Sequence, residues 1–194
     1  MSRAQQVHSK GQSNHPDNVT CTKRWLRGVV VRATRFWAPL LQLDARVDSI
    51  TLFIAPIDDP VIGDNGGACV IMDKTRRSAH IRIKQNVVYL MQNEYPNVTD
   101  PAEVVEMTVL HELNHIITNL ISDWVFSTIQ SMSSKKVLDS LFEQEEEQVV
   151  EHLTRAWFFA FKDNKENSSK RFKGKIIYLP KDLDVASPTI ESDD

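Results

Sequence analysis

The spacing of the apolar residues changes at Pro96, and this change sets the fold class. Before Pro96, three short runs rich in β-branched residues lie between residues 49 and 84, separated by turn-forming Asp, Asn, Gly and Pro. After it, apolar residues recur every three or four positions up to about residue 161, which is the period of an α-helix. Strands followed by long helices predict an α+β fold.

Five segments before and after this change have recognisable patterns. The runs Ser49–Ala55, Ala68–Asp73 and Ser78–Lys84 predict a small antiparallel sheet. In the last run, small or apolar side chains alternate with polar and basic ones, so one face is apolar and the other is solvated. Such a strand belongs near the edge or open face of the sheet. A helix from Trp25 to Leu43 and a short strand at residues 175–179 complete the prediction.

Composition favours one soluble domain with polar ends. In 194 residues, 41% are hydrophobic, which is enough for a core without disulfides, and the two cysteines suit a reducing compartment. No run of 18 apolar residues and no apolar signal segment occur, so we expect a cytoplasmic protein with no membrane contact. We divide the chain into a flexible polar arm (1–21), a single domain (22–180) and an acidic disordered tail (181–194).

The first helix after Pro96 carries a pattern of metal-binding residues. Asp100 is a good N-cap and Pro101 a good first helical residue. Within this helix, His111 and His115 are four residues apart, on one face and almost opposite the apolar stripe. Two imidazoles so placed can bind one zinc ion, and Glu112 is placed to act as a base on a zinc-bound water.

A third ligand is expected from the second long helix. Its acidic run Glu145–Glu147 opens the apolar part of the helix, and Glu146 falls at the centre of the apolar face. A carboxylate there needs a compensating charge, which a zinc ion supplies. Glu147 is the alternative, because Glu151 lies four residues further on and could orient a ligating histidine. For Glu145, a solvated position is the preferred interpretation.

The order of these motifs resembles a minimal zincin-type metallopeptidase. HELNH on a helix after a sheet, then a Glu-bearing helix, is similar to the gluzincin branch and to small intracellular or phage-encoded HExxH proteins. The metzincin extension is absent, since Thr118 and Ile121 stand where that pattern has glycine and histidine. The resemblance implies a minimal zincin-like domain, in which a small antiparallel sheet packs on the HExxH helix. It also implies one Zn²⁺ per chain.

In zincins, an edge strand near the active helix binds extended peptide, and by analogy of order this role falls to Ser78–Lys84, with Ser78, His80 and Arg82 beside the substrate. An ordinary sheet strand with a solvated Arg/Lys face is the equal alternative. The function expected is hydrolysis of a peptide bond by a zinc-activated water, with Glu112 taking the proton. The residues considered as ligand-orienting groups or oxyanion donors are Glu151, His152, Arg155, Tyr178 and His80.

Three other functions stay open at this point. The first is a zincin fold that binds or regulates peptides with weak or no proteolysis. The second is a nucleic-acid-associated module, whose basic residues lie near the N-terminus (Arg3, Lys10, Lys23, Arg24 and Arg27) and in the segment Lys162–Lys175. Nucleic acid is not expected as the main partner, because neither region interleaves aromatic residues for base stacking. The third is a structural helical domain with HExxH by chance. Substrate identity and oligomeric state are not predicted.

Overall fold

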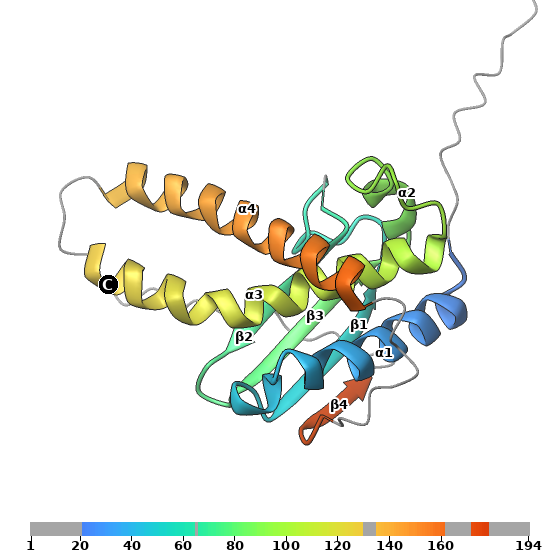
Figure 1. Cartoon of the computed structure of the whole chain (residues 1–194), viewed down its shortest axis with the longest axis horizontal. Coiled ribbons are helices and arrows are strands. Elements are labelled where there is room, and N and C mark those ends of the chain that lie inside the picture. The colour runs from blue at the N-terminus through green and yellow to red at the C-terminus, as the bar shows by residue number, and fades with distance from the viewer. Residues whose placement is uncertain (1–20, 65, 130–134, 162–171, 179–194) are drawn as a thin grey trace, which may run out of the picture.

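The computed structural model describes residues 21–64, 66–129, 135–161 and 172–178. Helices and a small mixed sheet share one hydrophobic core, so the α+β prediction is confirmed (Figure 1). In chain order the elements are α1 (Lys23–Leu40), the 3-10 helix η1 (Leu43–Ala45), β1 (Ser49–Ala55), β2 (Ala68–Asp73), β3 (Ser78–Lys84), α2 (Val87–Met91), α3 (Pro101–Ile129), α4 (Lys135–Phe161) and β4 (Lys175–Tyr178).

The sheet has the order β2-β3-β1-β4, and the predicted all-antiparallel arrangement is wrong. Strands β2 and β3 pair antiparallel, but β1 pairs parallel with both β3 and β4. The physical reason lies in residues 56–67, a connection long enough to carry the chain past the position beside β1. The β2–β3 hairpin then returns β3 into that position, and β2 becomes the outer strand.

The prediction that Ser78–Lys84 is an edge strand is therefore wrong as well. Strand β3 pairs on both sides, and the edges are β2 and β4. Its alternating polar side chains are not solvated either, because Arg82 and Lys84 point into contacts with the β1–β2 connection. Lys84 is 1% exposed, and its ammonium group donates to the carbonyl oxygen of Gly63.

Asp59 anchors the β1–β2 connection to the sheet. Its Oδ1 accepts hydrogen bonds from the backbone of Val61 (3.0 Å) and Ile62 (3.2 Å), and its Oδ2 pairs with the Arg82 guanidinium. The Asp59 side chain is 2% exposed. Because this connection leads directly into β2, the ion pair also holds the edge strand in place.

Helix α1 confirms the sequence prediction closely. Thr22 caps it by accepting a hydrogen bond from the backbone N–H of Trp25, and Pro39 lies in its last turn. The helix packs on α3 and on β1, and the indole N–H of Trp37 donates to Glu106 of α3 at 2.9 Å. This buried bond sets the position of α3 beneath the sheet.

Some of the predicted segments lie outside the residues that the structure describes. The polar arm, apart from Cys21, and the acidic tail 181–194 lie outside the described residues, as does residue 179 of the last predicted strand. The short elements η1 and α2 are not among the predicted ones. Among the described helices, none combines the length and the apolar character needed to cross a lipid bilayer.

Breaking the Asp59–Arg82 pair tests the anchoring of the β1–β2 connection. Asp59→Asn is expected to lower the free energy of unfolding by about 3 kcal/mol, because it leaves the guanidinium of Arg82 without its buried partner. Asp73→Asn is the matched control, since Asp73 pairs with Arg76 at the surface, where the Arg76 side chain is 83% exposed. Urea unfolding measures both, and equal effects would contradict this role of the pair.

The same pair gives a pH dependence. Burial alone would raise the pKa of Asp59, but the Arg82 guanidinium and two backbone N–H groups hold the pKa below its ordinary value. A lowered folded-state pKa stabilises the fold above the unfolded pKa of about 4, and this stabilisation is lost as pH falls through the folded value. The stability difference between the wild type and Asp59→Asn should therefore shrink below pH of about 4.

Candidate functional site

The start of α3 has the predicted geometry. Asp100 Oδ1 accepts a hydrogen bond from the backbone N–H of Ala102 at 2.9 Å, and its carbonyl accepts from Val104 at 3.1 Å. From this fixed start the helix runs through the core, where its apolar residues Val105, Val109, Leu110, Leu113 and Ile116 are buried. The side chains of His111 and His115 are 15% and 17% exposed and line a cleft, as the helical spacing predicts.

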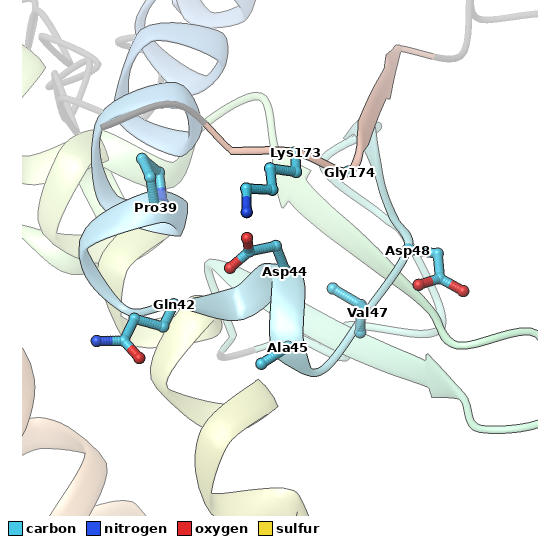
Figure 2. A pocket seen from close by; sticks show the side chains of 8 residues that line it. All are labelled: Pro39, Gln42, Asp44, Ala45, Val47, Asp48, Lys173 and Gly174. Atoms are coloured by element: carbon cyan, nitrogen blue, oxygen red, sulfur yellow. The ribbon is translucent and has the colours of Figure 1, made fainter. Parts of the chain in front are cut away.

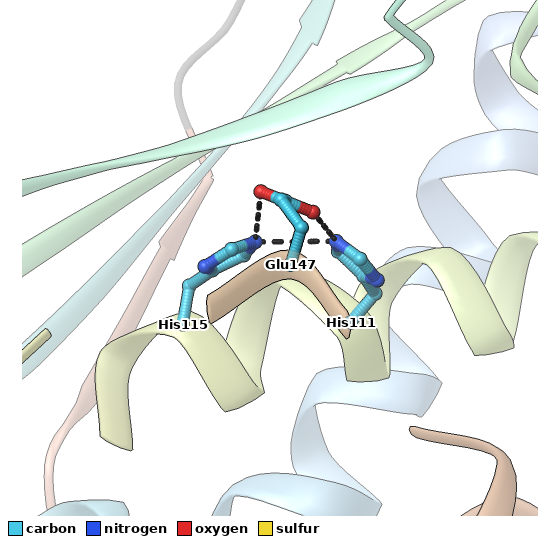
Figure 3. Close-up of side chains that lie close together, drawn as sticks. All are labelled: His111, His115 and Glu147. Atoms are coloured by element: carbon cyan, nitrogen blue, oxygen red, sulfur yellow. Dashed lines mark hydrogen bonds and ion pairs between the residues drawn. The ribbon is translucent and has the colours of Figure 1, made fainter. Parts of the chain in front are cut away.

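Glu147 of α4 meets both histidines (Figure 3). The two Nε2 atoms lie 3.2 Å apart, and the Glu147 oxygens lie 3.3 Å from Nε2 of His111 and 3.2 Å from Nε2 of His115. Ligands about 2.0–2.1 Å from a tetrahedral zinc ion are separated by about 3.3–3.4 Å. The separation of the two Nε2 atoms is close to this value, and one donor atom from each of the three residues lies within 4.8 Å of the others, so the cluster could hold a metal ion.

Two further carboxylates of α4 approach the other ring nitrogens. Nδ1 of His111 lies 3.5 Å from Glu151, and Nδ1 of His115 lies 3.5 Å from Glu146. Carboxylates in this position fix the orientation of metal-binding imidazoles and direct Nε2 towards the ion. Of the two predicted candidates for the third ligand, Glu147 is the one that lies in the group that could hold a metal ion. Glu146 instead accepts a hydrogen bond of 2.6 Å from the Thr118 hydroxyl.

The electrostatics of the cluster reflect this crowding of carboxylates. Burial by itself would lower the pKa of His111, but Glu147 and Glu151 raise it to about 10. The two histidines in turn hold the pKa of Glu147 well below its usual range. The carboxylates therefore favour a positive charge at the two imidazoles, which protons on the rings can provide. A divalent cation bound to the rings would provide this charge in place of those protons.

Glu112 lines the same cleft, but its pKa is shifted in the opposite direction to that of Glu147. Its side chain is buried, with 6% exposed, and among the described residues no group donates a hydrogen bond to it. Burial raises the pKa of Glu112 to about 7, against the opposing effect of His111 and His115. A buried carboxylate without a protein partner that faces a cleft is suited to accept a proton from a bound molecule.

The cleft has a volume of about 990 Å³ and is open to one edge of the sheet. Its walls are formed by the start of β2, by α2 and the turn after it, and by the facing sides of α3 and α4. Cys69 of β2 lines it beside Glu112, and burial followed by the charge of Glu112 raises the pKa of the thiol to about 11. That cysteine is therefore a neutral thiol at physiological pH.

Several predicted site residues lie elsewhere. Ser78, His80 and Arg82 belong to the interior strand β3 and do not line the cleft. Tyr178 lies on β4, where the Arg27 guanidinium stacks on its ring at 3.9 Å. These four residues are not brought to the histidines.

The two predicted residues further along α4 have different positions. His152 lines the cleft, and its Nδ1 lies 2.8 Å from the carbonyl oxygen of Gln148. Arg155 pairs with Glu151 and donates to the carbonyl oxygen of Glu94 at 3.0 Å. Arg155 thus connects the carboxylate beside His111 to the turn that follows α2, and acts as a positioning residue.

Sequence reasoning missed the β2–α2 side of the cleft. Ala68, Val70, Leu90 and Met91 line it, yet their pattern is that of ordinary strand and helix residues. One signal was present in the adjacent glycines Gly66 and Gly67, because a Cβ on Gly67 would lie 2.8 Å from the Met91 side chain and would displace it.

A second cavity of about 720 Å³ lies between η1 and β4 (Figure 2). Its lining includes Asp44, Asp48 and Lys173, and it contains none of the predicted site residues. The chemistry described above belongs to the cleft beside α3.

Comparison with known proteins adds no assignment: no family model, curated protein or solved structure matches the chain. The positions of the side chains in the cleft are therefore the basis for proposing a function.

Substitutions of the three consecutive glutamates test the ligand set. We expect about one zinc ion per chain in the wild type and loss of stoichiometric zinc in Glu147→Gln, because the ion loses its carboxylate ligand. Glu146→Gln should weaken zinc binding by about 10- to 100-fold, as expected for a group that orients a ligand.

Glu145→Gln is the matched control, since Glu145 is exposed and does not line the cleft. Competition with a chromogenic chelator measures all three affinities. If Glu147→Gln binds zinc as tightly as Glu145→Gln does, the assignment of Glu147 as a ligand is wrong.

Proposed function

We propose that this protein is a zinc-dependent hydrolase, and specifically a metallopeptidase. One observation supports this proposal above others. The buried carboxylate of Glu112, which accepts no hydrogen bond from the described residues, faces the same cleft as the cluster of His111, His115 and Glu147 that could hold a metal ion. A structural metal site has no need of such a carboxylate, whereas hydrolysis requires a base beside the metal.

In the proposed reaction, the residues of the cleft act as metal ligands, as a base or as groups that orient the ligands. His111, His115 and Glu147 would hold a zinc ion, which would supply Lewis acidity at the site. Glu112 accepts the proton of the attacking water and delivers it to the leaving amine. Glu146 and Glu151 hold the two imidazoles in the orientation that binds the ion.

The edge strand β2 is suited to hold an extended peptide. Lys84 donates its backbone N–H to Gly67, so Gly67 and Lys84 form a hydrogen-bonded pair of the antiparallel ladder. Hydrogen-bonded and non-hydrogen-bonded pairs alternate, and therefore the backbone groups of Ala68, Val70 and Met72 point away from β3. Ala68 and Val70 line the cleft, so their free N–H and C=O groups can pair with a substrate backbone.

Glu112→Gln tests the chemical step. The amide keeps the shape of the side chain but cannot take a proton, so we expect retained zinc and a fall in kcat of about 100-fold or more. Hydrolysis of unstructured protein substrates is followed by mass spectrometry, with Glu145→Gln as the control of equal charge change. Proteolysis by purified Glu112→Gln at the wild-type rate would exclude this role for Glu112.

The same experiment separates the enzyme from a binding protein with the same metal site. A wild-type protein that binds stoichiometric zinc and peptide but hydrolyses none, under conditions where Glu112→Gln is equally inactive, would contradict the peptidase proposal.

Proline substitutions in β2 test peptide binding at the edge. Val70→Pro removes an N–H that points out of the sheet, so the strand can keep its pairing with β3 while a substrate loses one hydrogen bond. We expect kcat/KM to fall by about tenfold with zinc binding unchanged. Met72→Pro removes an equivalent outward N–H outside the cleft and is the matched control. Equal effects of the two substitutions would argue against this binding mode.

A further inference from the structure

Helix α1 carries a one-sided row of arginines, remote from the cleft. Its 18 residues include Lys23 and four arginines but no acidic residue. The four arginines are exposed, and at about 100° per residue they fall within an arc of about 140°. The opposite side of the helix is buried in the core. We call this surface the arginine face; it consists of Arg24, Arg27, Arg32 and Arg35.

Among the residues that the structure describes, no carboxylate is paired with the arginine face. Within the ranges that the structure describes, none of the four guanidinium groups forms a salt bridge. Arg27 stacks on the ring of Tyr178, a contact that leaves its charge in place. Lys173, which precedes β4, differs from these arginines, because its ammonium group points towards the carboxylate of Asp44 (Figure 2).

This positive surface contrasts with the net charge of the whole chain, which is −3. The cleft is lined by five glutamates and by no lysine or arginine. No residue of α1 lines the cleft, so the arginine face and the acidic cleft are separate surfaces. A ligand of the arginine face does not need to enter the cleft.

We propose that the arginine face binds the phosphate backbone of duplex nucleic acid. Arginine presents a planar fork of donors that matches a phosphate group, and the four side chains extend over about 16 Å along the helix axis. The core holds the helix rigidly, so the charges form a preorganised row that suits the regular charges of a duplex. A membrane partner fits poorly, because the apolar side of α1 is buried and unable to insert into lipid.

The structure gives this surface a definition that the sequence lacked. The sequence separates these basic residues into two groups. The end of the polar arm is followed by Lys23, Arg24 and Arg27, and the apolar part of the predicted helix contains Arg32 and Arg35. Only the burial of the opposite face shows that the arginines share one exposed side. The proposal is independent of the zinc site and of peptidase activity.

Binding to a short labelled duplex tests the arginine face. Fluorescence anisotropy is measured on the full chain at several salt concentrations between about 50 and 200 mM, with a DNA duplex and an RNA duplex in parallel. The variant Arg24→Gln, Arg27→Gln, Arg32→Gln and Arg35→Gln should bind at least about tenfold more weakly. The slope of log K against log salt should fall in magnitude by about 3 to 4.

The control variant removes the same charge elsewhere, at four exposed basic residues: Arg46, Lys74, Arg76 and Lys173. Its affinity should stay within about threefold of the wild type, and circular dichroism verifies that both variants are folded. Binding to the DNA or the RNA duplex supports the proposal and names the nucleic acid. The proposal would be overturned if the wild type does not bind either duplex, or if the two variants lose the same affinity. It would also be overturned if polyglutamate competes as well as the duplex does per unit charge.

Discussion

The packing of α4 on α3 is the constraint on which the candidate site depends. Asn114 of α3 is fully buried and donates a hydrogen bond of 3.1 Å to the Thr154 hydroxyl of α4. Thr154 in turn bonds the carbonyl of Val150, so the contact is tied to the backbone of α4. A polar bond inside an apolar interface has few alternative partners, and it therefore fixes the rotation of one helix against the other. With that rotation set, three glutamates of α4 face the two histidines.

The resulting cluster concentrates charge in a cleft that is open on one side. Three carboxylates of α4 and one of α3 surround two imidazoles, and burial makes each uncompensated charge costly. The carboxylates raise the pKa values of both histidines, while Glu112 has its own pKa raised by burial. A bound divalent cation would compensate the carboxylates in place of the protons on the two histidines.

The sequence predicted the local features of the site and failed for those that depend on distant contacts. The histidines could be placed together because a spacing of four residues fixes their geometry within one helix. Glu146 and Glu147 differ by one helical step, and choosing between them required the rotation set by Asn114 and Thr154. The sheet order was missed because strand pairing across β1 and β3 depends on the path of residues 56–67. The burial of Lys84 was missed because its partner, the Gly63 carbonyl, belongs to that same connection.

The central claim is that α3 and α4 together form a zinc site of two imidazoles and one carboxylate. X-ray absorption at the zinc K-edge of the stoichiometrically loaded protein tests it most directly. We predict a shell of about four nitrogen or oxygen ligands at about 2.0–2.1 Å, with the outer-shell signal of two imidazoles. A sulfur ligand at about 2.3 Å, which would implicate Cys69, or failure to bind zinc at one ion per chain would contradict the account.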